Sequence, residues 1–132
     1  MKLHIYTDGM ELENEPISLQ QAFELLEKQS DHSMVEDNFI GFTIDNDDKA
    51  IIQFIRFNEK KWTIDIPAYE EMRYIGALTN QVSHDLVFSI TRDFFDTNSL
   101  FHKSIKLKKY ENITEYMKTR YGVIFEFEVK EY

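Results

Sequence analysis

The chain has 132 residues, of which 42% are hydrophobic and 14% aromatic, and its formal net charge is −9. This length matches one domain of common size, so we expect residues 1–132 to fold as a single domain around one core. The absence of cysteine excludes disulfides, thiolate metal sites and thiol nucleophiles. No run reaches the ~20 apolar residues of a membrane span and no signal-peptide core follows Met1, which predicts a cytoplasmic protein outside the membrane.

The acidic charge is concentrated near the start of the chain. Residues 1–48 contain 12 acids and 2 lysines, a balance of −10, whereas residues 49–132 contain 12 acids and 13 bases, a balance of +1. An acidic surface repels a phosphate backbone, so the composition disfavours nucleic-acid binding. The same surface would attract a basic protein partner, and it would equally serve as a solvated face that keeps the protein soluble.

The first elements are a predicted strand and a predicted helix. Residues 2–7 alternate in polarity and reach the turn dipeptide Asp8-Gly9. Ser18 and Gln21 have the spacing of a capping box, and the apolar residues that follow fall on one stripe of a helix. We expect this helix to lie on a sheet, with its charged side toward solvent.

A meander of strands follows the polar loop at residues 30–38. Its predicted strands cover residues 39–45, 50–57, 61–66 and 74–78. Pro67 is expected to end the third of them. The connections are short, which favours antiparallel pairing, because parallel neighbours need a long crossover.

The second predicted helix covers residues 83–96, with Ser83 as its N-cap. One of its faces is apolar, and Phe88 and Phe95 form a second apolar strip nearly opposite. The helix is therefore either sandwiched between two layers or partly exposed.

A third helix and a last strand complete the predicted elements. A polar, lysine-rich connection leads to Asn112, which can cap a helix that Gly122 closes. Residues 123–130 then alternate, and the apolar positions of this run are expected to face the core. These positions are Val123, Phe125, Phe127 and Val129. The expected fold is α+β: an antiparallel sheet of about five or six strands, with two longer helices packed on one face and a short third helix.

Residue types and spacings favour no catalytic or metal site. His4, His32, His84 and His102 are far apart and lack zinc-site spacing. The neighbouring residues Ser83, His84 and Asp85 would point about 100° apart on a helix and cannot form a catalytic relay. Glycine-rich phosphate loops are absent. We expect neither enzyme activity nor a cofactor.

The acidic turn at residues 45–48 begins like a calcium loop but does not continue as one. The sixth position holds Ala50 where glycine is expected, and the twelfth holds Arg56 in place of the bidentate glutamate. A tight turn with solvated carboxylates is the better interpretation. Glu70 and Glu71 are likewise expected to be loop charges, because no apolar pocket is predicted around them.

Several segments carry a resemblance to a known class of protein. They are Ile17-Ser18-Leu19, Phe39-Ile40-Gly41-Phe42, Gln53-Phe54-Ile55-Arg56, Trp62-Thr63-Ile64-Asp65-Ile66-Pro67, and Val82-Ser83-His84 opening a helix that ends in Asp93-Phe94-Phe95. In this order, over residues 17–96, they resemble the small bacterial immunity proteins encoded beside polymorphic toxins. The resemblance implies a cytoplasmic inhibitor that binds one cognate toxin and blocks it.

The leading hypothesis is therefore an inhibitor that binds a toxin through its acidic surface, which would complement a basic toxin. The candidate contact residues are acids on two loops, Glu36 and Asp37 before the 39–45 strand and Asp45, Asp47 and Asp48 after it. A strand of this length separates the two groups by about 20 Å, so we expect one group to dominate a contact. We favour the turn, because it holds its charges at lower entropic cost than a mobile loop.

Two alternatives belong to other classes of function. The sheet and its helices could enclose an apolar ligand or substrate pocket lined by Trp62, Phe54 and tyrosines. The protein could also be a structural subunit that forms a homodimer through Phe88 and Phe95; the sequence leaves open whether it is a monomer or a homodimer. The packing of Trp62 bears on the first alternative, and we expect this residue to be substantially buried.

Overall fold

The computed structural model describes the backbone of residues 1–7, 10–30, 39–56, 58 and 60–129, with the side chains of these residues except 3–7, 10–14 and 29–30. The strands are β1 (Lys2–Thr7), β2 (Met10–Pro16), β3 (Phe39–Ile44), β4 (Asp47–Arg56), β5 (Lys61–Glu70), β6 (Arg73–Ser83) and β7 (Glu126–Val129). The helices are α1 (Leu19–Ser30), α2 (His84–Phe95), α3 (Leu100–Lys106) and α4 (Tyr110–Tyr121).

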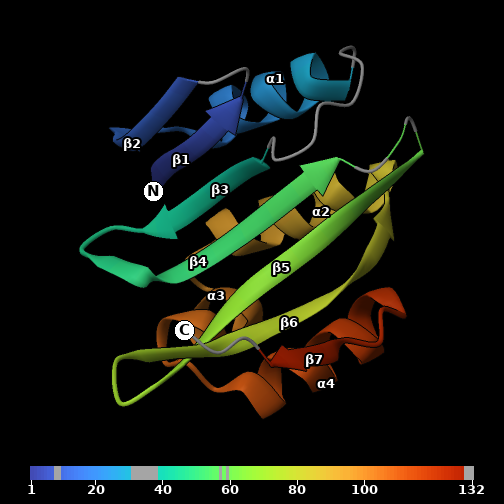
Figure 1. The fold of residues 1–132 in the computed structure, drawn as a ribbon. Coiled ribbons are helices and arrows are strands. Elements are labelled where there is room, and N and C mark those ends of the chain that lie inside the picture. Colours follow the sequence, from blue (N-terminus) through green and yellow to red (C-terminus); the bar gives the residue numbers. More distant parts are fainter. Residues whose placement is uncertain (8–9, 31–38, 57, 59, 130–132) are drawn as a thin grey trace.

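The described strands form one sheet in the order β2-β1-β3-β4-β5-β6-β7, and each neighbouring pair is antiparallel (Figure 1). Apart from the β1–β2 hairpin at one end, the order in space follows the order in the chain. The predicted α+β class with an antiparallel sheet is confirmed. Short connections produce this arrangement, because they allow each strand to pair with the one just made.

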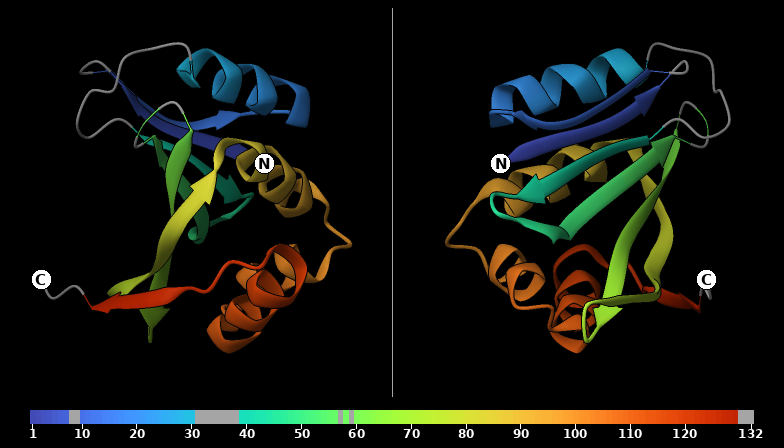
Figure 2. Two further views of the ribbon diagram at one scale, coloured as in Figure 1. Left: turned by 90° about the vertical axis from the view of Figure 1, so that its right-hand side faces the viewer. Right: turned by 60° about the vertical axis from the view of Figure 1, so that its left-hand side comes forward.

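The four helices lie on one side of the sheet, behind it in Figure 1 and beside it in the two views of Figure 2. The core fills the space between the two layers and contains Phe42, Phe54, Trp62, Ile90 and Phe94, all fully buried. Alternation along each strand places one side chain in two toward the helices. The predicted burial of Trp62 is confirmed, with 0% of its surface exposed.

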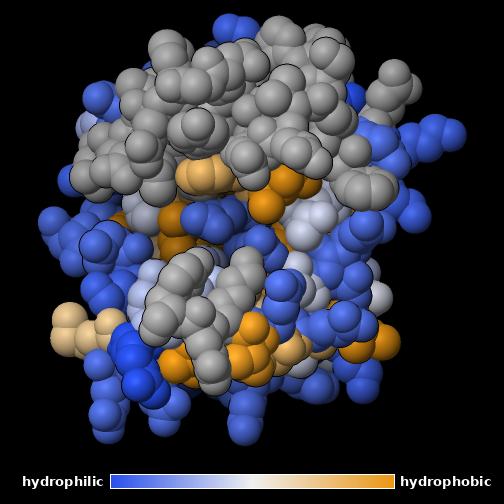
Figure 3. Space-filling model, in the orientation of Figure 1, coloured by the Kyte–Doolittle hydropathy of each residue, from blue (hydrophilic) through white to orange (hydrophobic). Residues whose placement is uncertain are grey.

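The opposite face of the sheet is more polar. The register places Gln53, Asp65, Thr79 and Glu126 side by side on four adjacent strands. Figure 3 views this side of the molecule and shows hydrophilic residues mixed with apolar ones, the latter mainly in the centre and low in the view. Within the described helices, none is long and apolar enough to cross a membrane.

Strand β2 was not predicted. Its sequence, MELENEP, has three glutamates and no regular apolar alternation, so it lacks a strand signal of its own. It forms by pairing with β1 over Lys2↔Pro16 to Thr7↔Met10, with a register shift between Leu3 and Ile5. Asp8 and Gly9, the predicted turn, lie outside the described residues.

Strand β5 continues through Pro67 to Glu70, so the predicted stop at this proline is wrong. The pairing of β5 with β4 extends only as far as Asp65, opposite Gln53. Beyond that point β5 is paired with β6 alone, and Pro67 lies opposite Ala77. Proline is tolerated in a strand with one free side, because its missing N–H is not required there.

The predicted serine caps at Ser18 and Ser83 are confirmed. The backbone N–H of Gln21 donates to Ser18 Oγ at 3.2 Å, and the N–H of Ser18 donates to Gln21 Oε1 at 2.9 Å, which completes the predicted capping box. Ser83 caps α2 by accepting from the N–H of Leu86. Gly122 ends α4 in the left-handed conformation, with φ of 70°, as predicted.

The segment before α4 differs from the prediction. The lysine-rich connection contains the short helix α3, which Ser99 caps by accepting from the N–H of His102. The predicted cap at Asn112 is wrong, because α4 begins at Tyr110 with Lys109 as its N-cap and no side-chain cap bond. Burial of Phe101, Ile105, Ile113 and Met117 against the core explains both helices, since packing outweighs a missing cap.

The last strand is shorter and less buried than predicted. Val123 and Phe125 are buried in the core as expected. Phe127 and Val129 are 48% and 64% exposed, so the prediction that they face the core is wrong. Phe127 lies opposite buried Leu78 in the register, on the helix side of the sheet, but at the edge strand the helix layer no longer covers it.

Candidate functional site

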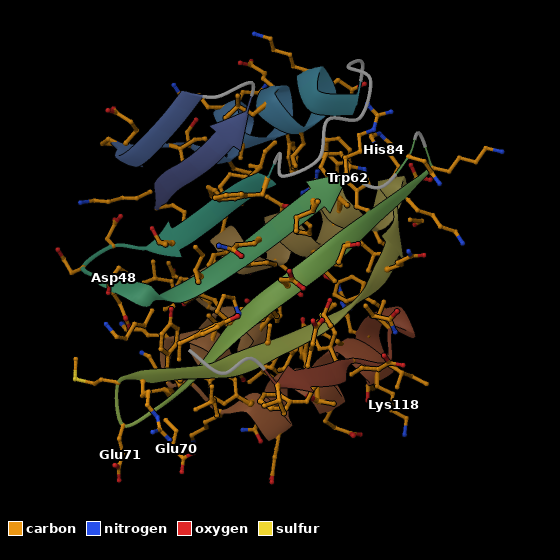
Figure 4. All side chains as sticks on the ribbon, viewed as in Figure 1. Asp48, Trp62, Glu70, Glu71, His84 and Lys118 are labelled. Atoms are coloured by element: carbon orange, nitrogen blue, oxygen red, sulfur yellow. The ribbon has the colours of Figure 1, made fainter. Side chains whose placement is uncertain are left out.

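The acidic turn (residues 45–48) joins β3 to β4: Asp45 and Asn46 lie between the strands, and Asp47 and Asp48 are the first residues of β4, with Asp48 at the left in Figure 4. Asn46 has a positive φ of 64°, a left-handed conformation that asparagine tolerates better than most residues. Asp45 is 58% exposed and forms an ion pair with the amino group of Met1 at 2.9 Å. Asp48 is 84% exposed and forms an ion pair with Lys49, whose Nζ is 3.6 Å from Oδ1.

Asp47 differs from Asp45 and Asp48, because its side chain is half-buried and both of its carboxylate oxygens accept hydrogen bonds. Its Oδ2 accepts from Lys108 Nζ at 2.8 Å, and its Oδ1 accepts from the N–H of Lys49 at 3.2 Å. The side chain is only 29% exposed. The pair connects the acidic turn to the loop between α3 and α4. The three carboxylates of the turn are therefore not equivalent, and Asp45 and Asp48 are the two that extend into solvent.

The second predicted group, Glu36 and Asp37, lies outside the described residues. Its predicted separation of about 20 Å from the turn stays a prediction. Among the described residues, no group of three or more possible metal ligands occurs, at the acidic turn or elsewhere. Glu70 and Glu71 lie at the hairpin between β5 and β6 and are both exposed, at the lower left in Figure 4.

Two shallow grooves meet beside the start of α1, and one of them includes the acidic turn. They share the walls Pro16, Ile17 and Gln21. The larger groove, of about 510 Å³, is also lined by Met1 and Asp45, and the smaller, of about 350 Å³, by Glu24, Leu25 and Lys28 of α1. Sequence reasoning missed them, because their walls come from the N-terminus, the first helix and the β3–β4 turn.

The alternative of an apolar pocket named Trp62 and Phe54 as lining residues, and the side chains of both have no exposed surface. Both side chains are fully buried in the core, and neither lines the two grooves. Trp62 Nε1 donates to His84 Nδ1 at 3.2 Å, and Figure 4 shows the two side chains next to each other. Because Nδ1 accepts this bond, neutral His84 carries its proton on Nε2.

The apolar strip of α2 is used within the molecule. Phe88 contacts Phe23 of α1, with ring centroids 5.5 Å apart, and Phe95 contacts Phe42 of β3 at 5.3 Å. Both rings are half-buried. Helix α2 is therefore in contact with a helix on one side and the sheet on the other. Only part of each ring is left to contact a second copy.

A polar cluster joins α2 to α4 around Asp93, and the sequence analysis did not find it. The hydroxyls of Tyr116 and Tyr121 both donate to Asp93 Oδ2. Desolvation, and then the hydrogen bond to Asp93, raises the pKa of Tyr116 to about 12, and the pKa of Tyr121 is raised for the same reasons. Both tyrosines therefore stay protonated at neutral pH and act as donors. The cluster fixes α4 on α2.

Comparison with protein-family models, curated proteins and solved structures finds no match to this chain.

Proposed function

We propose that the protein is an immunity-type inhibitor that binds a basic protein toxin through its acidic turn. The proposal rests on one observation: the acidic charge that is segregated in the sequence is also segregated in space. Within residues 1–48, the part that the structure describes carries eight acids and two lysines, a balance of −6, and provides β2, β1, β3, α1 and the β3–β4 turn. These elements form one end of the sheet, because the strand order there is β2-β1-β3.

The charge segregation supports a basic partner for a physical reason. Separate charges on a surface add to a common potential, which orients an oppositely charged protein before contact and raises its association rate. Acids scattered over the whole surface would produce a weaker field at any one place. A toxin that acts on nucleic acid needs a basic site for its substrate, and an acidic face would complement that site.

Within the turn, Asp45 and Asp48 are the proposed contact residues. Asp48 projects furthest into solvent, and Asp45 borders the larger groove, where a basic side chain from a partner could reach it. Asp47 has a different role in this proposal. Its ion pair with Lys108 holds the turn in place, so that less entropy is lost when the partner binds. Glu36 and Asp37 are the proposed secondary group.

The first experiment tests inhibition itself. The toxin domain encoded beside the gene for this chain is expressed in a bacterial host under tight control, with and without the chain. We expect growth to be restored only when the chain is present, and a complex of the two proteins to survive gel filtration. Continued growth arrest with a soluble, folded chain, or the lack of any neighbouring toxin gene, would contradict the inhibitor proposal.

The second experiment tests the acidic turn. The double variant Asp45→Asn/Asp48→Asn is compared with the single variant Asp47→Asn. This control makes the same substitution at the aspartate that is paired with Lys108. We expect the double variant to slow association about tenfold at low salt and to flatten its salt dependence, while the dissociation rate changes little. Equal association rates for wild type and the double variant would exclude the turn but leave inhibition intact.

A further inference from the structure

Strand β7 is one of the two outer strands of the described sheet, and all four of its residues are exposed. The register opposes Glu126 to Thr79, Phe127 to Leu78, Glu128 to Ala77 and Val129 to Gly76, so one edge of β7 is paired with β6. The order of strands leaves no described strand on its other edge. Such an edge presents backbone N–H and C=O groups to whatever extended chain approaches it.

The position of β7 is fixed by Gly76. This residue has φ of 151°, and a Cβ at this position would collide with the backbone carbonyl of Glu128 and contact the ring of Phe127. Glycine is therefore required for the close approach of β7 to β6. A fixed strand can serve as a template, because its backbone groups are already arranged for pairing.

The two faces of β7 have opposite chemistry. Phe127 and Val129 lie on the helix side and expose large apolar surfaces, and Ile124 just before the strand is also exposed. Glu126 and Glu128 lie on the other side, and both are exposed. An added strand would need apolar residues on one face and basic residues on the other.

A second copy of the chain does not meet this requirement. In an antiparallel pair of identical strands, residues of one face meet residues of the same face. A pairing that sets Phe127 opposite Phe127 of the copy also sets Glu126 opposite Glu128, and one that sets Phe127 opposite Val129 sets Glu128 opposite its own copy. Like charges directly opposite one another are destabilising.

The other outer strand has a different composition. The sequence of β2 contains Glu11, Glu13 and Glu15, and such charges on an edge strand discourage pairing with further chains. Exposed aromatic or β-branched residues are the distinguishing feature of β7. The two edges of the sheet are thus unequal as sites for strand addition.

We propose that the free edge of β7 binds an extended protein segment in which basic and apolar residues alternate, as an additional strand of the sheet. Backbone hydrogen bonds would provide most of the affinity, and the alternation would provide the selectivity. Lysine or arginine would lie opposite Glu126 and Glu128, and aliphatic or aromatic residues would pack on Phe127 and Val129. This surface is at the opposite end of the strand order from β2 and is independent of the acidic turn.

The probe is a synthetic peptide of about seven residues that alternates lysine and valine, with blocked termini, added to the full chain labelled with ¹⁵N. Two further peptides serve as controls. One replaces each lysine by glutamate, and the other keeps every lysine but has proline in place of the central valine, which removes a backbone donor. The titration is followed by NMR at physiological ionic strength, where weak charge attraction is screened.

We expect the lysine–valine peptide to shift the amides of residues 126–129, with affinity about tenfold above that of the glutamate or the proline peptide. The variant Glu126→Lys/Glu128→Lys should reverse the preference and select the glutamate peptide. Both positions are exposed, so this variant should keep the melting temperature of the wild type.

Three results would overturn the proposal. One is the absence of peptide-induced shifts at β7, and another is equal binding of the lysine–valine and proline peptides, which would indicate charge attraction alone. The third is dimerisation of the free chain that Phe127→Lys abolishes, since the edge would then belong to a second copy. Because none of these measurements uses a toxin, they are distinguishable from a failure of the inhibitor proposal.

Discussion

The indole Nε1 of Trp62 donates a hydrogen bond to Nδ1 of His84, so the one tryptophan of the chain is connected to the first residue of α2. The ring of His84 contacts Phe88, and Phe88 contacts Phe23, with centroids 5.1 Å and 5.5 Å apart. Through these rings β5, α2 and α1 meet in one aromatic cluster. The cluster joins the meander to the acidic end of the molecule.

Replacing Trp62 by alanine should lower the free energy of unfolding by about 3–5 kcal/mol, because the side chain is fully buried and would leave a cavity. Chemical denaturation followed by circular dichroism measures the change. Trp62→Phe is the control, since it keeps an aromatic ring and should cost less. A loss below about 1 kcal/mol for the alanine variant would contradict the packing described here.

The hydrogen bond itself can be isolated in a double-mutant cycle of Trp62→Phe and His84→Ala. We expect a coupling free energy of about 0.5–1.5 kcal/mol, the net value of one hydrogen bond. His84→Ala alone should lower the free energy of unfolding by more than this coupling free energy, because it leaves the buried indole N–H without an acceptor. Additive effects of the two substitutions would mean that the bond contributes nothing to stability.

Alkaline pH should destabilise the fold through Tyr116. Its pKa is raised from 10.0 to about 12, so the folded state holds the phenol proton more tightly than the unfolded chain. The stabilisation is complete below pH 10 and is lost as the pH rises through about 12. Unfolding free energies measured across this range should fall less steeply for Tyr116→Phe. Parallel pH profiles for the variant and the wild type would refute the assignment.

The ion pair of Asp47 and Lys108 should contribute up to about 1 kcal/mol, since both side chains are partly exposed. Asp47→Asn and Lys108→Met should lower the free energy of unfolding by similar amounts, and the double variant should lower it by little more than either single variant. The coupling should shrink as salt is added. A coupling near zero at low salt would show that the pair does not hold the turn.

Gly76→Ala should release β7 from the sheet at a cost of about 1–3 kcal/mol, because the added Cβ meets the carbonyl of Glu128. Hydrogen exchange should accelerate first at residues 126–129. Gly122→Ala is the matched control, since that glycine also has positive φ but no atom lies near its missing Cβ. If hydrogen exchange at residues 126–129 is equally slow in both variants, the close approach at Gly76 does not fix the strand.

Much of the fold could be predicted because its signals are local. Ser18, Ser83 and Gly122 act as caps through bonds to residues within a few positions of each other, which any chain with that spacing can form. The strands of the meander were found from alternation, which depends only on the two-residue period of a strand. The one strand without such a signal, β2, needed the neighbouring β1 to form.

The candidate site could be predicted only in part. The sequence located the acidic turn and its three aspartates, but their charges were treated as equivalent. The structure separates Asp47 from Asp45 and Asp48, because Lys108 reaches it from 61 positions away in the chain. The grooves beside α1 and the cluster around Asp93 were also missed, since each brings together residues from distant segments.

The sequence by itself determined the alternation of the meander strands, the caps at Ser18, Ser83 and Gly122, and the segregation of acidic charge along the chain, because these depend on residue type and short spacing. Only the tertiary structure decided which apolar faces are covered and which charges are paired. Phe125 and Phe127 show the difference. They share one alternating run and differ by two positions, yet the first is buried and the second is half-exposed, because the helix layer ends before it reaches the edge of the sheet.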